Sequence, residues 1–167
     1  MLVVALVHSR LDYGNSVLVG LLAYLLCQLQ SVLNAAARLV YHLRDCNHIT
    51  DALISLYWLR APERILYKMA VLTYQYKAVH GGSPCYLSSL VHVTDVSGRP
   101  TLSSAGLNRL QISPFKLSTI GGRAFSVAAA QFWNSLPDNV TSANSLSAFR
   151  QQLKHTLFQR SFPDIIM

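Results

Sequence analysis

One segment, residues 121–137, specifies its own local structure almost residue by residue through the sequence GGRAFSVAAAQFWNSLP. The pair Gly121–Gly122 interrupts regular structure, because glycine destabilises helix interiors. Small and aromatic residues from Arg123 to Trp133 favour a helix, and Asn134–Pro137 ends it with turn-forming residues. The segment holds no nucleophile beside a base, no metal-ligand set and no phosphate-binding loop. We therefore expect it to act by packing.

Helical periodicity continues upstream. Between residues 24 and 43 apolar residues recur at three- and four-residue steps, which predicts a helix with one buried face. The residues expected on that face are Leu25, Leu29, Val32, Leu33, Ala36, Leu39, Val40 and Leu43. The residues expected on the opposite, polar face are Ser31, Asn34, Arg38, His42 and Asp45. We expect Thr50 to cap a short helix that carries Leu53, Ile54 and Tyr57.

A longer helix is predicted after Pro62, because proline is accepted in the first helical turn and Glu63 suits the helix dipole there. Its apolar residues, from Ile65 onward, lie on two sides, which is typical of a helix buried between neighbours. The run Gly81–Pro84 ends it, and residues 84–90 can form a further short helix.

The remaining segments complete a mainly α prediction. Residues 91–120 alternate only over short stretches and are punctuated by glycine and proline, so we expect a loop-rich segment with one or two short strands. Residues 142–145 are expected to cap a last helix. Its inward residues would be Leu146, Phe149, Leu153 and Leu157, and its outward residues Arg150, Lys154 and Arg160. The predicted architecture is an irregular helical bundle, with a helical region 1–90, a linker 91–120 and a helical pair 121–167.

The composition limits what the chain does. Among 167 residues 51% are hydrophobic and only 13% are charged, which suggests apolar surface left for a neighbour, as in a piece of a larger protein. No two of the seven acidic residues are adjacent, and two-metal nucleotidyl transfer needs clustered carboxylates. We therefore predict no polymerase or nuclease centre and no enzyme activity. The net charge of +7, concentrated after residue 98, suits nucleic acid or an anionic membrane.

Other site chemistries are also not indicated. The run His80–Ser83 is interpreted as a helix end and turn, since no Gly-x-Ser-x-Gly elbow exists. His42, Cys46 and His48 lack the second ligand pair of a zinc site, so no metal, cofactor or small-molecule substrate is expected. Three widely spaced cysteines indicate an intracellular compartment, nuclear or cytoplasmic. No apolar run reaches the length of a transmembrane helix, and the start in mid-helix is expected of a fragment.

Two features remain for interpretation. Trp58 and Trp133 are interpreted as core or interface anchors, because tryptophan buries a large area. The last helix, if basic on one face, could lie on a membrane, enter a partner's groove or follow a phosphate backbone, against the simpler interpretation of a solvated face. The residues that we assign to the structural signature are Trp58, Trp133, Asn134, Leu136 and Pro137.

Seven blocks along the chain carry a family resemblance. They are Ser9–Tyr13, Asn34–Leu39, His48–Thr50, Leu56–Leu59, Glu63–Ile65, Gly122–Ser126 and Trp133–Pro137. In order and spacing, from about residue 5 to residue 158, they resemble the region after the reverse transcriptase core in jockey-like non-LTR (LINE) retrotransposon polyproteins. WNSLP alone is weak evidence, but seven blocks in the right order are specific.

The resemblance implies a non-catalytic C-terminal fragment of an RNA-directed DNA polymerase, whose catalytic acids would lie upstream. Residues 1–90 would be a thumb-like or post-polymerase helical region that braces the upstream polymerase domain and binds nucleic acid weakly. The candidate contacts are Arg38, Arg123, Arg150, Lys154 and Arg160. Two alternatives remain: a scaffold module that docks partners on exposed apolar faces, and peripheral membrane association through the last helix.

Overall fold

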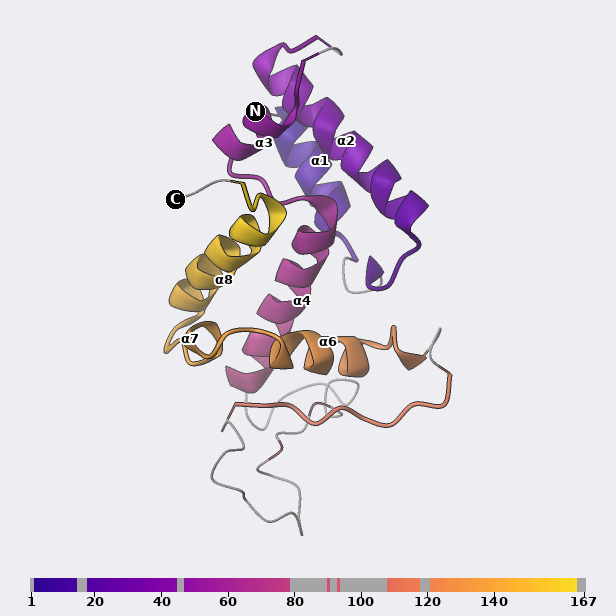
Figure 1. The fold of residues 1–167 in the computed structure, drawn as a ribbon, viewed down its shortest axis with the longest axis vertical. Helices are drawn as coiled ribbons and strands as arrows, with labels where there is room; N and C mark the ends of the chain where they lie inside the picture. The colour runs from indigo at the N-terminus through magenta and orange to yellow at the C-terminus, as the bar shows by residue number, and fades with distance from the viewer. Residues whose placement is uncertain are drawn as a thin grey trace. The chain divides into compact units, whose positions relative to one another are not determined.

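A computed structural model describes residues 2–14, 18–44, 47–78, 90, 93, 108–117 and 121–164. Within them the fold is mainly α, as predicted, and contains no β-sheet (Figure 1). The helices are α1 (Leu2–Asp12), α2 (Ala23–Tyr41), α3 (Thr50–Ser55), α4 (Ala61–Ala78), α6 (Phe125–Asn134), α7 (Asp138–Thr141) and α8 (Leu146–Ser161).

The chain divides into two compact units. The first comprises Met1–Lys68 and Leu153–Met167, and the second comprises Met69–Gln152. Both divisions fall inside helices, so α4 and α8 each contribute residues to both units. The predicted boundaries at residues 90 and 120 lie next to residues outside the described ones, and they stay predictions.

The core of the first unit includes buried residues of α2, of α3 and of the segment that follows α3. α2 buries Leu33, Ala36 and Ala37 completely or nearly so. It ends at His42, which takes a left-handed conformation (φ 52°), and Arg38 O accepts the N–H groups of His42 and Leu43. This pattern satisfies carbonyl groups that a helix end otherwise leaves unpaired.

The predicted buried face of α2 is partly wrong. Val32, Leu39 and Val40 were expected inside, but they are 47%, 62% and 38% exposed. The buried face centres on Leu33 and Ala36–Ala37, because α2 packs against α1 and α3 on that side. α2 therefore carries more apolar residues than its neighbours in the described part of the unit cover.

The starts of α3 and α4 differ in how well they were predicted. Thr50 is the first residue of α3 and not its cap, which is Ile49 without a side-chain hydrogen bond. Tyr57 lies beyond this helix with φ 54°. α4 begins at Ala61, so Pro62 stands in its first turn as predicted. The Ala61 N–H donates to Gln30 Oε1 at 2.8 Å, so a side chain of α2 satisfies one of the free N–H groups at the start of α4.

The second unit packs α6 into a core of small and aromatic side chains. α6 buries six residues, namely Val127, Ala128, Ala129, Ala130, Phe132 and Trp133, which confirms the helix predicted between Arg123 and Trp133. Residues 93 and 108–117, the described part of residues 91–120, form no strand, and the rest of the segment in which one or two short strands were expected lies outside the described residues. A single backbone hydrogen bond joins Val93 N–H to Arg109 O at 3.1 Å. The expected Gly81–Pro84 stop and the 84–90 helix lie outside the described residues, apart from buried Leu90.

The C-terminal helix is close to its prediction. α8 begins at Leu146, and Ser145 Oγ accepts the Ala148 N–H at 3.2 Å, the geometry of an N-cap. Phe149, Leu153 and Leu157 are buried as expected, and Arg150 and Arg160 are exposed. Lys154 was predicted to point outward, but it is half-buried, because its ammonium lies 4.5 Å from the centre of the Tyr57 ring. The short helix α7 was not foreseen.

Candidate functional site

The signature residues Trp133–Pro137 join α6 to α7. Ser135 and Leu136 N–H groups donate to Phe132 O and Trp133 O, and the Ser135 hydroxyl also donates to Phe132 O at 2.7 Å. Pro137 then takes φ −62° and ψ 149° as the cap of α7. Its carbonyl accepts the N–H groups of Val140 and Thr141. The motif therefore encodes a helix end, a turn and a helix start, since proline has a fixed φ that suits a helix start.

Asn134 binds an extended segment of its own unit. Its Oδ1 accepts the Leu110 N–H at 2.9 Å, and its Nδ2 donates to Leu110 O at 2.9 Å. The carboxamide thus satisfies both backbone groups of Leu110, as a neighbouring β-strand would. Asparagine is suited to this role because it carries both a donor and an acceptor. Leu110 is 1% exposed, so the two bonds stabilise backbone groups that water does not readily reach.

Trp133 binds the same extended segment at Asn108, two residues before Leu110. Its indole N–H donates to Asn108 O at 2.7 Å, which gives a buried tryptophan the polar partner that it normally requires. Its ring stacks on Phe149 with centroids 5.7 Å apart, and Phe149 stacks on Tyr74 at 4.4 Å. The Tyr74 hydroxyl donates to Ala143 O at 2.9 Å. The prediction of Trp133 as a core anchor is confirmed, since it is 1% exposed.

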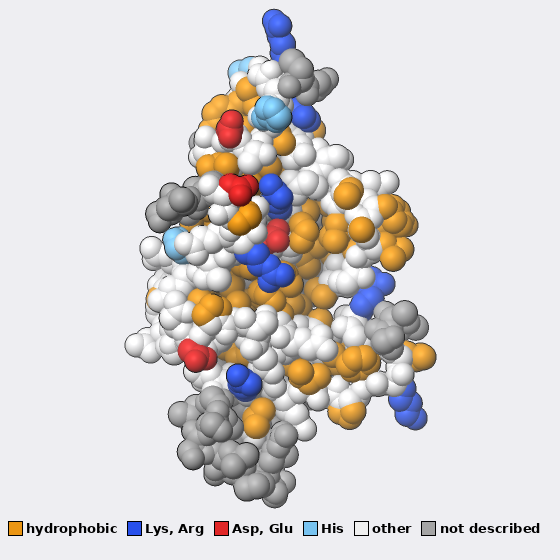
Figure 2. Space-filling view, viewed as in Figure 1, with side chains coloured by type: hydrophobic (Ala, Val, Ile, Leu, Met, Phe, Trp, Pro, Cys, Tyr) orange, Lys and Arg blue, Asp and Glu red, His pale blue; other side chains and the backbone are white. Residues whose placement is uncertain are grey.

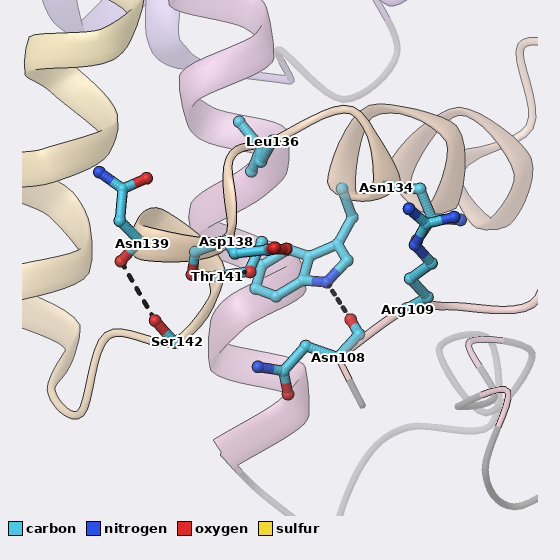
Figure 3. A pocket seen from close by; sticks show the side chains of 9 residues that line it. Asn108, Arg109, Asn134, Leu136, Asp138, Asn139, Thr141 and Ser142 are labelled. Carbon is cyan, nitrogen blue, oxygen red and sulfur yellow. Dashed lines mark hydrogen bonds between the residues drawn. The ribbon is translucent and has the colours of Figure 1, made fainter. Parts of the chain in front are cut away.

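A pocket of about 350 Å³ opens beside this contact. Its lining residues are Asn108, Arg109, Trp133, Asn134, Leu136, Asp138, Asn139, Thr141 and Ser142. Figure 3 shows Arg109 at the opposite side of the view from Asn139 and Ser142. The Ser142 hydroxyl donates to Asn139 O at 3.4 Å. Two of its polar groups, the Trp133 indole N–H and the Asn134 carboxamide, already bind backbone of the same chain.

A close backbone approach explains the first glycine of the signature. A Cβ atom added at Gly121 would lie 2.7 Å from Phe115 Cβ, and the Gly121 N–H donates to Leu117 O at 2.7 Å. Residues 115–117 therefore pass directly over this position. The sequence predicted a break here, and the structure supplies the reason, which is contact with a preceding segment.

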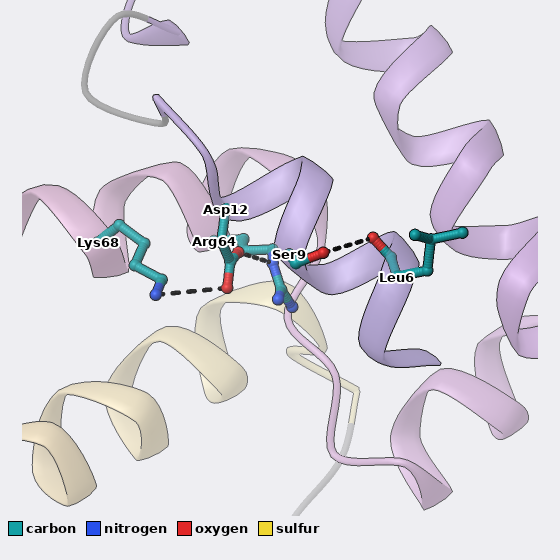
Figure 4. Close-up of polar contacts among 5 residues, drawn as sticks. All are labelled: Leu6, Ser9, Asp12, Arg64 and Lys68. Atoms are coloured by element: carbon teal, nitrogen blue, oxygen red, sulfur yellow. Dashed lines mark hydrogen bonds and ion pairs between the residues drawn. The ribbon is translucent and has the colours of Figure 1, made fainter. Parts of the chain in front are cut away.

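The first unit contains a charged cluster that links α1 to α4. Arg64 Nε lies 2.6 Å from Asp12 Oδ1, and Lys68 Nζ lies 3.3 Å from Asp12 Oδ2 (Figure 4). Burial alone would raise the pKa of Asp12, but the hydrogen bond and charge of Arg64, together with Lys68, outweigh it and lower that pKa below its ordinary value. The carboxylate therefore stays charged as a structural tie between two helices.

His8 and Trp58 form a second contact in that unit. Their ring centroids are 4.4 Å apart, and Trp58 is 7% exposed, which confirms Trp58 as a core anchor. Burial lowers the pKa of His8, and the nearby charges of Arg64 and Lys154 lower it further against the opposing effect of Asp12. His8 Nε2 is buried without a hydrogen-bond partner. A neutral imidazole is the form that this environment favours.

The predicted nucleic-acid contacts have unequal surroundings. Arg123, Arg150 and Arg160 are exposed, whereas Arg38 and Lys154 are half-buried. Burial, and then the charge of Arg64, lower the pKa of Lys154. Arg38, Lys154 and Arg160 belong to the first unit, and Arg123 and Arg150 to the second.

Residues that sequence reasoning did not single out carry much of this geometry. They are His8, Asp12, Arg64, Lys68, Asn108 and Leu110. Because 52 residues separate Asp12 from Arg64, no local pattern in the sequence connects them. The one available signal was that each of them lies in a block of the family resemblance. Nothing in the sequence identified Leu110 as the partner of Asn134, because a side chain that binds backbone leaves no trace in the partner's residue type.

The described part of the chain holds neither a metal-binding cluster nor a helix that could span a membrane. No group of three or more histidine, cysteine or acidic residues is placed to hold a metal ion there. His42 and His48 are exposed, and Cys46 lies outside the described residues. None of the helices described here combines the length and apolarity needed to cross a bilayer. Comparison of the chain with family models, curated proteins and solved structures gives no match.

Proposed function

We propose that the chain is a non-catalytic helical support region of a LINE-type reverse transcriptase polyprotein. The observation that carries this proposal is the use of the signature side chains. The side-chain polar atoms of Trp133 and Asn134 form hydrogen bonds with backbone of Asn108 and Leu110 in the same unit. Residues that the resemblance singles out therefore stabilise a fold that presents helices to a neighbour.

A contact between two blocks of the resemblance supports the same proposal. Asp12 of the Ser9–Tyr13 block pairs with Arg64 of the Glu63–Ile65 block, 52 residues away. Trp58, of the Leu56–Leu59 block, is buried against His8, which lies just before the Ser9–Tyr13 block. These contacts support a role of the blocks in stabilising a tertiary fold.

The proposal is tested with a jockey-like reverse transcriptase domain truncated before the region that this chain resembles. Adding the chain is expected to give a complex in sedimentation velocity and to raise primer extension on an RNA template. The Asn134→Ala variant, which loses the Leu110 contact, is the matched control and should bind less. No complex at micromolar concentrations, with the chain folded by circular dichroism, contradicts the support role.

Weak nucleic-acid binding is a second part of the proposal, and the exposure of Arg150 and Arg160 favours it. In filter binding with a duplex, log K is expected to fall with log salt by about 0.9 per phosphate contacted. The Arg150→Gln/Arg160→Gln variant should flatten this slope. Arg10→Gln/Arg44→Gln, which removes two other exposed arginines, is the control. Absence of retention at about 50 mM salt excludes this part.

The membrane alternative has little support, because the apolar residues of α8 are used inside the units. Phe149 and Leu153 are fully buried, and Leu157 is 1% exposed. A helix that lies on a bilayer needs that face free. The scaffold alternative is favoured by a different observation, the exposed apolar residues of α2.

A further inference from the structure

α2 carries an exposed face without charge. The residues on it are Tyr24, Gln28, Ser31, Val32, Ala35 and Leu39, all exposed. Tyr24 is 60% exposed, and Val32 and Leu39 are also largely open to solvent. Figure 2 shows apolar side chains gathered on the side of the molecule where α2 begins. The solvent face of a helix normally carries charged residues, so this neutral, partly apolar face is suited to contact with protein.

The spacing of these six residues is symmetric about the middle of the helix. α2 spans Ala23–Tyr41. A two-fold rotation that reverses the helix direction about a point between Ser31 and Val32 exchanges the six positions in pairs. An antiparallel copy would then place Tyr24 opposite Leu39, Gln28 opposite Ala35, and Ser31 opposite Val32. Each pair joins a larger side chain to a smaller one, which allows the two faces to interdigitate. A two-fold interface requires this kind of self-complementary patch.

Electrostatics favour the same arrangement. Two antiparallel helices bring the positive N-terminal end of one beside the negative C-terminal end of the other. A parallel pair would instead place like ends together. At the centre, the Ser31 hydroxyl donates to Gln28 O at 2.7 Å, so its polar group is already satisfied when the face is covered. The face carries no charge that would repel its own copy.

We propose that this face of α2 is a self-association surface, on which a second copy of the chain packs its own α2 antiparallel across a two-fold axis. One helix face is smaller than the about 800 Å² per partner of a stable interface. The dimer is therefore weak and depends on concentration. This surface is separate from the support role proposed above and does not depend on it.

The test is sedimentation equilibrium of the whole chain from about 1 μM to about 1 mM. Two double variants differ only in the sign of one added charge. Gln28→Glu/Ala35→Lys creates two attractive pairs across the antiparallel interface, and Gln28→Lys/Ala35→Lys creates two repulsive pairs. Positions 28 and 35 are about 10 Å apart along one helix, so the added charges act mainly between copies. We expect the first variant to dimerise about tenfold more tightly than the second.

A control variant adds the same two positive charges elsewhere. Gln151→Lys/Gln159→Lys changes exposed residues of α8 and should dimerise like the unmodified chain. Far-ultraviolet circular dichroism checks that every variant remains helical. An unmodified chain that stays monomeric throughout the series overturns the proposal, whatever other protein covers the face. Equal dimerisation of the two charged variants overturns the antiparallel geometry.

Discussion

Each of the two units is stabilised internally, and the contacts that stabilise them differ in chemistry. In the second unit three aromatic rings stack in series, and two signature side chains bind backbone of the same unit. In the first, Arg64 and Lys68 meet Asp12, and cations lie over rings, with Arg60 4.9 Å from the centre of Phe162. The first unit also leaves large apolar residues of α2 exposed. Most signature residues lie in the second unit, where Trp133 and Asn134 bind backbone, whereas Trp58 lies in the first.

The largest expected effect separates the two tryptophans. Trp133→Ala should lower the free energy of unfolding by about 3 to 5 kcal/mol, because it opens a cavity in a fully packed core. Trp58→Ala should be less damaging, since no hydrogen bond of the Trp58 indole is found in the described part of its unit, whereas the Trp133 indole donates to Asn108 O. Urea unfolding measures both, and each variant keeps the other tryptophan as the fluorescent reporter. An equal loss in both variants would remove the distinction between the units.

Removing the hydrogen bonds between the Asn134 side chain and the Leu110 backbone should have the next largest effect on stability. Asn134→Ala loses two hydrogen bonds and leaves the buried Leu110 backbone unpaired, at a cost of about 2 to 3 kcal/mol. Hydrogen exchange of the Leu110 amide should accelerate in step with the loss. Asn134→Asp is the control, because a carboxylate can still accept the Leu110 N–H but cannot donate to Leu110 O. Unchanged exchange in Asn134→Ala would show that the carboxamide does not protect this amide.

A third variant tests the close approach at Gly121. Gly121→Ala should destabilise the chain by about 1 to 3 kcal/mol, because the new Cβ would lie too close to Phe115 Cβ. Thermal unfolding measures the effect. In a Phe115→Gly background the same substitution should be much less costly, since the opposing atom is gone. A similar cost in both backgrounds would assign the effect to backbone conformation.

The ion pairs of Asp12 should contribute less to the free energy of unfolding, since its Lys68 partner is 41% exposed and solvent screens that charge. Asp12→Ala is expected to cost about 1 to 2 kcal/mol, mainly through loss of the charged hydrogen bond to Arg64. Because the pKa of Asp12 is lowered in the folded chain, its contribution is present above the ordinary aspartate pKa and is lost as pH falls through the lowered value. Asp12→Ala should therefore flatten stability at acidic pH, as urea unfolding across a pH series measures.

The smallest effect is expected from His8. Its pKa in the folded chain is lowered, so protonation favours the unfolded state. The corresponding stability is present above the ordinary histidine pKa of about 6.5 and is lost as pH falls from there through the lowered value. His8→Phe keeps a ring against Trp58 and should remove this component of the pH dependence. His155→Phe, at an exposed site, should leave it in place.

Sequence periodicity was a good guide wherever one face of a helix meets a continuous core. Pro62 marked the start of α4, Ser145 capped α8, and Phe149, Leu153 and Leu157 turned inward as their spacing predicted. The same reasoning failed for Val32, Leu39 and Val40 of α2. Apolar spacing reports which residues can be buried, but a neighbour must be present to bury them. For the candidate site, the sequence identified Trp133 and Asn134 but neither of their partners.

By itself, the sequence determined a mainly helical chain, the end of a helix at Asn134–Pro137, and tryptophans placed as anchors. These follow from local preferences of the backbone and from the area that large side chains bury. Only the tertiary structure decided that Asn134 binds Leu110, that Asp12 holds Arg64 and Lys68, that Phe115 leaves no room at Gly121, and that one face of α2 remains open. Each of these depends on which distant segments meet, and no local preference encodes that.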